Sequence, residues 1–219
     1  MIDGDFMKIN VNNIYKKFGD NVVLDNVNVS FESGKIYGLV GRNGSGKSVF
    51  LKILCGFYKP NSGNVLFDNY DYIDNNKYPT MLRALVEKPQ FFPELSGFTN
   101  LKILAEIQKK IGEDQINYAL DIVNLKEEKN KKVYKYSLGM KQKLGIAQAI
   151  MENPDIIVLD EPFNGIERDS VNKIKNYLLK LKKEDKLIII STHIKEDIID
   201  LADSIYEFDS GKINEVKIV

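Results

Sequence analysis

The residues at 41–48, Gly-Arg-Asn-Gly-Ser-Gly-Lys-Ser, have the types and the spacing of a loop that binds phosphate. Glycines let the backbone turn tightly, so successive N–H groups can point at phosphate oxygens. The apolar run 36–40 before the loop predicts a buried strand, and 49–55 after it predicts a helix whose N-terminus favours an anion. We expect Lys47 to reach the β- and γ-phosphates of a nucleotide and the Ser48 hydroxyl to bind Mg²⁺.

Two carboxylates end a second aliphatic run, 155–160, which is typical of a central parallel strand. Such a strand brings its last residues to the C-terminal edge of the sheet, where ligands bind in open α/β folds. Asp160 therefore fits a partner of Mg²⁺, directly or through water. Glu161, the next residue, fits a group that orients and activates a water molecule, and beside a phosphate loop we favour this role over that of a solvated loop carboxylate.

His193 is the only histidine, and it follows a third aliphatic run, 187–190, after two short polar residues. It should therefore reach the same edge of the sheet. A lone histidine is usually structural, but this position favours contact with the γ-phosphate or with the attacking water.

Ser137 and Gly139 stand at the start of a predicted helix over 139–151. A serine hydroxyl, a glycine and a helix N-terminus form either a second anion site or a simple helix cap. The residues alone favour the cap. A second anion site would make sense if it served a nucleotide bound to another copy of the chain.

The remaining pattern predicts an α/β fold. Alternation of apolar and polar residues over 8–15 and 27–31 indicates antiparallel strands. Helical spacing replaces it between 96 and 151. We expect a P-loop NTPase core with a parallel sheet, an N-terminal antiparallel β part and an inserted α-helical part. The other expected elements are strands at 64–67 and 82–87, helices near 99–110, 114–124 and 168–183, and a closing hairpin of 205–208 with 213–218.

Composition narrows the function classes. The 31 basic and 31 acidic side chains balance, which gives no electrostatic reason to expect nucleic acid as a partner. The single cysteine, Cys55, excludes a disulfide within the chain, and we expect it to be a small buried residue. No apolar run approaches the roughly 18–20 residues that a membrane helix needs, and the first residues lack the pattern of a signal peptide.

In order and spacing these segments resemble the ATP-binding subunits of ABC transporters, over essentially the whole chain. The loop at 41–48 matches the Walker A segment of that family, and 156–161 matches Walker B with the catalytic glutamate. Ser137 and Gly139 match the serine and the second glycine of the signature segment. Further matches are 164–167 with the D-loop, His193 with the switch histidine, and Phe18 with the aromatic residue that stacks on adenine.

The resemblance implies a single ATP-binding domain over 1–219. In it, 1–87 and 152–219 form the nucleotide-binding core and 88–151 the helical signature part. ATP and Mg²⁺ are the implied ligands, and Glu161 and His193 the implied catalytic residues. The residues implied to contact the nucleotide are Phe18, Gly41, Asn43, Gly44, Ser45, Gly46, Lys47, Ser48, Val49, Glu87, Ser137 and Gly139; those implied to bind the metal are Ser48, Asp160 and Glu87.

Three departures from the family pattern stand out. Counting back from the Phe-Pro pair at 92–93 places Glu87, and not Gln90, where the family has the glutamine of its Q-loop. A carboxylate there can still contact Mg²⁺ or water, but it adds negative charge near a triphosphate. Glu167 replaces the shorter aspartate of the D-loop. The signature reads Tyr-Ser-Leu-Gly-Met-Lys-Gln at 136–142, a form that resembles the branch exporting bacitracin, lantibiotics and other drugs.

The resemblance also implies partners. Two copies, or one copy and a paralogous ATP-binding subunit, meet head to tail, so that residues 137 and 139 of one cover the ATP held by the other. An integral-membrane permease on a separate chain is the second expected partner. We therefore expect a cytoplasmic protein, peripheral on the inner face of the cell membrane, that powers export of a drug or an antimicrobial peptide and binds no nucleic acid.

Other functions fit the sequence less well. The main alternative is an ABC-type ATPase that acts on nucleic acid or ribosomes, but such proteins carry long coiled coils or two such domains, of which the sequence shows neither. A GTPase would need Asn-Lys-x-Asp, and Asn-Lys-Tyr-Pro at 76–79 fails at the last position. A nucleotide kinase would need a phosphoryl acceptor other than water. The presence of Glu161 and His193 disfavours a non-catalytic regulatory subunit.

Overall fold

Aliphatic strands form the centre of the molecule in the computed structural model, which describes residues 7–75, 77 and 79–216. In this part of the chain six strands form one sheet in the order β5-β6-β7-β3-β8-β9, parallel except for the last pair. All residues of β3, β6 and β7 are buried, which explains their unbroken aliphatic sequences. The strands are β3 (Ile36–Val40), β5 (Leu82–Leu85), β6 (Ile156–Asp160), β7 (Leu187–Thr192), β8 (Ser204–Asp209) and β9 (Lys212–Val216).

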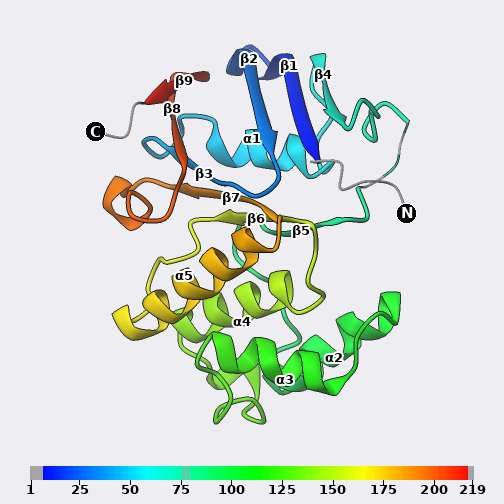
Figure 1. Ribbon diagram of the computed structural model, residues 1–219, viewed down its shortest axis with the longest axis vertical. Helices are drawn as coiled ribbons and strands as arrows, with labels where there is room; N and C mark the ends of the chain where they lie inside the picture. The colour runs from blue at the N-terminus through cyan, green and yellow to red at the C-terminus, as the bar shows by residue number, and fades with distance from the viewer. Residues whose placement is uncertain (1–6, 76, 78, 217–219) are drawn as a thin grey trace.

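An antiparallel sheet and a helix cover one face of this sheet, in the upper half of Figure 1. The sheet has the order β2-β1-β4, with β1 (Lys8–Phe18), β2 (Asn21–Glu32) and β4 (Ser62–Phe67). Helix α1 (Lys47–Leu54) lies below it. One apolar core contains Phe31 of β2, Phe50 of α1 and Leu39 of β3, so both sheets and the helix pack together. Cys55 is buried in this core, and burial raises the pKa of its thiol to about 12.

Four helices cover the other face, in the lower half of Figure 1. They are α2 (Gly97–Gln108), α3 (Glu113–Ile122), α4 (Leu138–Ile150) and α5 (Arg168–Lys183), with short 3-10 helices at η1 (Val133–Lys135) and η2 (Lys195–Asp197). The helices expected near 99–110, 114–124 and 139–151 lie within two residues of these bounds. The predicted fold class is confirmed, whereas the division of the chain at 88 and 151 stays a prediction.

Some predicted boundaries need correction. The strand expected over 82–87 ends at Leu85, and Glu87 adopts a left-handed backbone with a φ of 66°, which lies outside the extended region typical of strands. The helix expected from 49 begins earlier, at Lys47. The closing hairpin is present, but its second strand ends at Val216, and Ile218 lies outside the described residues.

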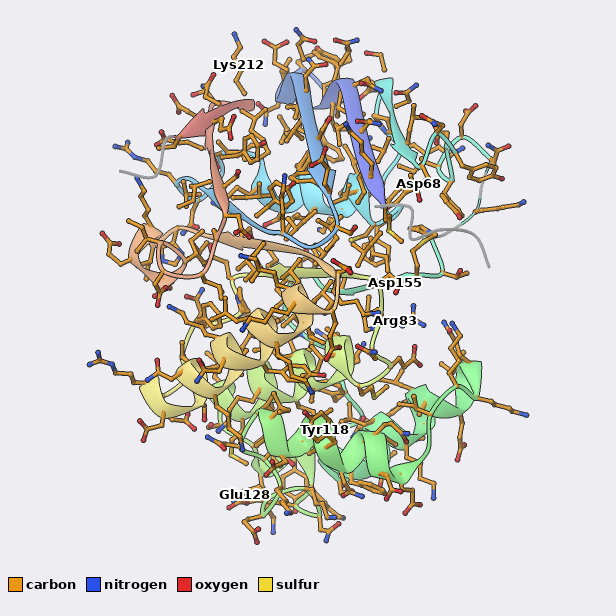
Figure 2. The ribbon with its side chains drawn as sticks, in the orientation of Figure 1. Asp68, Arg83, Tyr118, Glu128, Asp155 and Lys212 are labelled. Carbon is orange, nitrogen blue, oxygen red and sulfur yellow. The ribbon has the colours of Figure 1, made fainter. Side chains whose placement is uncertain are left out.

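Ion pairs connect the sheet to the helices. Arg83 of β5, labelled below Asp155 in Figure 2, donates its Nε–H to Glu152 at 2.6 Å, just after α4. A second ion pair joins two helices: the ammonium of Lys143 on α4 lies 2.6 Å from a carboxylate oxygen of Glu167, at the start of α5. The Lys143 side chain is only 6% exposed, so Glu167 supplies the countercharge that a buried ammonium requires.

Glu167 is held in its charged form by this contact. Hydrogen bonds from Lys143 and from the Ser170 hydroxyl, in that order, lower the pKa of the Glu167 carboxyl to about 2, from an ordinary value of 4.5. The Ser170 hydroxyl lies 2.7 Å from the same oxygen and itself accepts a bond from Asn124. The longer acid of the D-loop segment is therefore part of a bonded network that joins α5 to the helical part.

We expect Glu167→Ala to destabilise the chain by about 1–3 kcal/mol at neutral pH, because it leaves the ammonium of Lys143 buried without its partner. The lower end is expected, since the Glu167 side chain is 58% exposed. A carboxyl whose pKa is lowered by folding contributes stability above its unfolded pKa, and this contribution disappears as the pH falls from 4.5 towards 2. Denaturant unfolding of both proteins at several pH values measures the difference.

The matched control is Glu184→Ala, which removes an exposed acid 3.8 Å from Lys180 and should change stability by less than about 0.5 kcal/mol. A difference between wild type and Glu167→Ala that stays the same from neutral pH to pH 3 would contradict the role of the carboxylate.

Candidate nucleotide-binding site

The loop at 41–46 leads from β3 into α1, as predicted. Gly46 caps the helix with a φ of 108°, and a Cβ at this position would lie 2.8 Å from the carbonyl oxygen of Val23. Only glycine fits both the conformation and the space. The N–H of Gly211 donates to the carbonyl of Ser45 at 3.1 Å, so the turn between β8 and β9 fixes the loop from the other side.

Two side chains of the loop lack the partners they would have with a bound anion. The ammonium of Lys47 is buried and donates to the carbonyl oxygens of Gly41, at 2.6 Å, and Arg42, at 3.1 Å. Burial lowers the pKa of Lys47, while Glu161 and Asp160 act in the opposite direction. The Ser45 hydroxyl is buried without a hydrogen-bond partner among the described residues. A phosphate oxygen would satisfy both groups.

Asp160 ends β6 directly opposite Ser191 of β7, and the buried Ser191 hydroxyl donates a hydrogen bond to its carboxylate. Asp160 and Ser48 line one cleft of about 580 Å³. No cluster of three or more His, Cys, Asp or Glu side chains that could hold a metal occurs in the described part of the chain. The oxygen donors of Asp160 and Ser48 fit Mg²⁺, which is usually held by one or two carboxylates together with substrate phosphates.

Glu161 and His193 meet, as the sequence predicts for two residues at one edge of the sheet. Oε2 of Glu161 lies 2.8 Å from Nδ1 of His193 and accepts a bond from the side-chain amide of Asn164 at 3.3 Å. Glu161 has a left-handed φ of 49°, a conformation that is uncommon for residues other than glycine. An acid that lines the cleft, next to the predicted magnesium ligand, is thus oriented by a histidine and an amide.

Three further residues at this edge are absent from the sequence-based set. Gln142 of α4 donates to the carbonyl oxygen of Glu161 at 3.0 Å. Ser191 of β7 pairs with Asp160 and donates a hydrogen bond to its carboxylate, and the signal that points to it is a polar residue directly after the aliphatic run 187–190. Lys52 of α1 pairs with Glu87, which lines the cleft together with Gln90.

The signature residues serve the chain itself. The Ser137 hydroxyl accepts a bond from the N–H of Met140 at 3.1 Å, so it caps α4, as the residues alone favour. A Cβ on Gly139 would lie 2.2 Å from the carbonyl oxygen of Gly165. Leu138, between them, is exposed and lines the cleft.

Phe18 ends β1 and is half exposed. Its ring meets the edge of Tyr58 at a centroid distance of 5.7 Å, and the ammonium of Lys16 lies 5.0 Å from its centroid. Among the described residues, neither Phe18 nor Ser137 lines the 580 Å³ cleft. In one copy of the chain the cleft thus brings together Ser48 and the carboxylates of Glu87, Asp160 and Glu161, and its lining does not include Phe18 or Ser137.

Comparison with known proteins decides the family. The family model described as ABC transporter matches residues 24–164. The chain belongs to the ABC transporter family. An uncharacterized ABC transporter ATP-binding protein of Bacillus subtilis, YybJ, is 42% identical over 94% of this chain and 94% of its own length. The bacitracin transport ATP-binding protein BcrA of Enterococcus faecalis is 37% identical over 94% of this chain and 68% of its own length.

A solved structure agrees with this assignment. The dimeric structure of MJ0796, a bacterial ABC transporter cassette, superposes with a TM-score of 0.85 at 26% identity, and covers 96% of this chain and 99% of that one. The predicted ATP-binding subunit, its fold and its ATPase activity are confirmed, as is the resemblance to the bacitracin branch. In the described part of this ABC transporter subunit, no helix has both the length and the apolar sequence needed to cross a membrane.

We expect Gly139→Ala to destabilise this ABC transporter subunit by about 1–3 kcal/mol, because the new methyl group would overlap the backbone of Gly165 and force the two segments apart. Denaturant unfolding of the isolated chain, without nucleotide, measures this. Gly112→Ala is the matched control, since a Cβ there meets only the side chain of Gln115 at 3.7 Å. Equal stability of the two variants would show that Gly139 is not required within one copy.

Proposed function

We propose that two copies of this chain, or one copy and a paralogous subunit, bind ATP and Mg²⁺ between them and drive a separate integral-membrane permease. The observation that carries the proposal is the meeting of Glu161 and His193 at the cleft that Ser48 and Asp160 line. Phosphate ligands, metal ligands and a water-activating acid are all needed for hydrolysis, and this edge of the sheet supplies them.

The phosphate loop would hold the triphosphate. Backbone N–H groups at the start of α1, the Lys47 ammonium and the Ser45 hydroxyl face the β- and γ-phosphates. Ser48 and Asp160 would hold Mg²⁺, which neutralises negative charge on the phosphates when it is bound. The other proposed nucleotide contacts are Gly41, Asn43, Gly44, Gly46 and Val49 in the loop, with Phe18 stacked on the adenine.

Hydrolysis would proceed by attack of a water oxygen on the γ-phosphorus, with the bond to ADP breaking. Glu161 accepts a hydrogen bond from this water and takes its proton as the new P–O bond forms. His193 holds the Glu161 carboxylate through Nδ1 at 2.8 Å, and with both ring nitrogens protonated it can also donate from Nε2 to a γ-phosphate oxygen. Gln142 and Asn164 keep the acid in place through its backbone and its side chain.

A second copy would complete each site. Ser137 and Gly139 lie outside the cleft of their own chain, and the dimeric cassette to which the chain is similar supports a paired arrangement. Each charge-assisted hydrogen bond to phosphate contributes about 1.5–3 kcal/mol. Because about 5.5 kcal/mol moves an open–closed equilibrium from 1:99 to 99:1, a few contacts with the γ-phosphate in each site are enough to close the pair. Hydrolysis removes these contacts and lets it open.

The relatives of the chain support the proposed permease and the proposed cargo. BcrA, by its name, takes part in bacitracin transport, which supports export of a drug or an antimicrobial peptide by the system to which this chain belongs. In that arrangement the chain lies in the cytoplasm, against the inner face of the membrane. Glu87, predicted to contact Mg²⁺ or water, is the one metal candidate whose carboxylate is already paired with a cation.

Glu161→Gln tests the proposed function. We expect the variant to bind ATP, to hydrolyse it at least about 100-fold more slowly because the amide cannot accept the proton, and to accumulate as an ATP-dependent dimer. Phosphate release and size-exclusion chromatography with Mg-ATP measure both effects. Glu106→Gln, on the surface of α2, is the control and should behave like wild type. Wild-type turnover by Glu161→Gln would remove this residue from the catalytic role.

Lys47→Ala tests the phosphate loop separately. Loss of the charge-assisted bonds should weaken ATP binding by roughly 10-fold to 150-fold, which corresponds to about 1.5–3 kcal/mol. Displacement of a fluorescent ATP analogue measures the affinity. Lys183→Ala, an exposed lysine at the end of α5, serves as the control. If ATP affinity were unchanged by Lys47→Ala, the assignment of the loop would be wrong.

A further inference from the structure

An ion pair lies at the nucleotide cleft, and one of its two partners lines it. The ammonium of Lys52 forms a hydrogen-bonded ion pair with the carboxylate of Glu87. Lys52 lies on α1 four residues after Ser48, and residues at this spacing share one face of a helix. Glu87 lines the same cleft as Ser48 and Asp160. The pair therefore joins the helix that carries the phosphate loop to the segment after β5.

The two partners are held to different degrees. The Lys52 side chain is only 16% exposed. Its ammonium lies 5.0 Å from the ring centroid of Tyr58 and 3.5 Å from the hydroxyl of that residue. The Glu87 side chain is 62% exposed, and the residue lies outside any helix or strand. Packing thus fixes the cation, and the position of the cation decides where the carboxylate lies.

The pairing of Glu87 with Lys52 matters because the cleft is lined by acidic side chains. Three carboxylates, those of Glu87, Asp160 and Glu161, line a cleft where a triphosphate would add several negative charges. Asp160 would face a divalent cation, but an unpaired carboxylate at 87 would repel the phosphates. Lys88 also lines the cleft, but it is exposed and has a mobile four-carbon chain. With Lys52 beside it, Glu87 presents a neutral pair, which is the net charge of the glutamine expected at this position.

We propose that Lys52 is a positioning residue that binds the Glu87 carboxylate to α1 as a neutral pair and keeps it out of the coordination of the metal. The inference rests on the proposed binding of Mg-ATP, and it assigns Glu87 a use other than the contact with Mg²⁺ or water predicted from the sequence. The carboxylate of Glu87 contributes to the charge of the cleft, and its pairing with Lys52 determines whether that contribution weakens the binding of ATP.

Single and double variants of the pair test this through the direction in which each one changes the affinity for Mg-ATP. Lys52→Met leaves the carboxylate unpaired and should weaken binding of Mg-ATP by about threefold to tenfold. Glu87→Gln leaves the ammonium unpaired and should keep or tighten binding, by up to about threefold. The double variant should return close to wild type. Displacement of a fluorescent ATP analogue by ATP at fixed and varied Mg²⁺ gives the affinities, and raising the salt concentration should shrink each shift.

The matched control is the ion pair of Lys102 with Glu113, which joins α2 to α3 at 2.6 Å on an exposed surface. Lys102→Met, Glu113→Gln and their combination remove the same charges from the same residue types and should leave ATP affinity unchanged. A purely structural role of the Lys52–Glu87 pair would lower the melting temperature of both single variants without shifts of opposite sign in affinity.

Several outcomes would overturn the inference. If Glu87 binds the metal, Glu87→Gln weakens Mg-ATP binding and raises the Mg²⁺ requirement in both backgrounds, whereas Lys52→Met tightens binding. Should Lys52→Met fail to fold, Glu87→Gln, a change at an exposed side chain, still gives the decisive sign. Failure of the wild-type chain to bind Mg-ATP would instead reject the proposed function. Binding by wild type without rescue in the double variant would reject only the neutral pair.

Discussion

The register between β6 and β7 is the constraint on which the candidate site depends. It places Asp160 opposite Ser191, whose hydroxyl binds the carboxylate and whose carbonyl accepts the N–H of Glu161 at 2.9 Å. Both strands are parallel, and β7 extends only one residue beyond the end of β6, so the residues that follow them emerge at one edge, where Glu161 meets His193. A slip of one residue would turn Asp160 to the other face of the sheet and would separate these groups.

The lysines near this edge of the sheet differ in whether a carboxylate neutralises them. The buried ammonium of Lys143 is matched by Glu167, and Lys52 by Glu87, while the hydrogen-bond partners of the Lys47 ammonium among the described residues are backbone carbonyl groups. The first two cations are already neutralised within the chain. Lys47 is the buried cation that retains capacity for an anion, which agrees with its position at the start of α1 behind the glycine loop.

Local patterns predicted the parts of the molecule that are determined locally. The aliphatic runs gave the central strands because they are buried on both faces, and the spacing of glycines and Lys47 gave the loop. Contacts between segments distant in sequence could not be predicted from one chain: Gln142 with the carbonyl of Glu161, Lys52 with Glu87, and the end of β5 two residues before Glu87 all depend on how α4 and α1 pack. Such contacts arise from tertiary structure and have no local signal.

The contacts between α4 and the segment 161–167 show how events at the cleft can reach the helical part. Gly139 lies against the carbonyl of Gly165, and Gln142 donates to the carbonyl of Glu161. Lys143 binds the carboxylate of Glu167. Three positions near the start of α4 therefore contact this one short segment. Close packing and a buried ion pair resist separation of the two, and they must therefore shift together. These contacts connect the segment that begins at Glu161 directly to the N-terminal half of α4, where the signature residues lie.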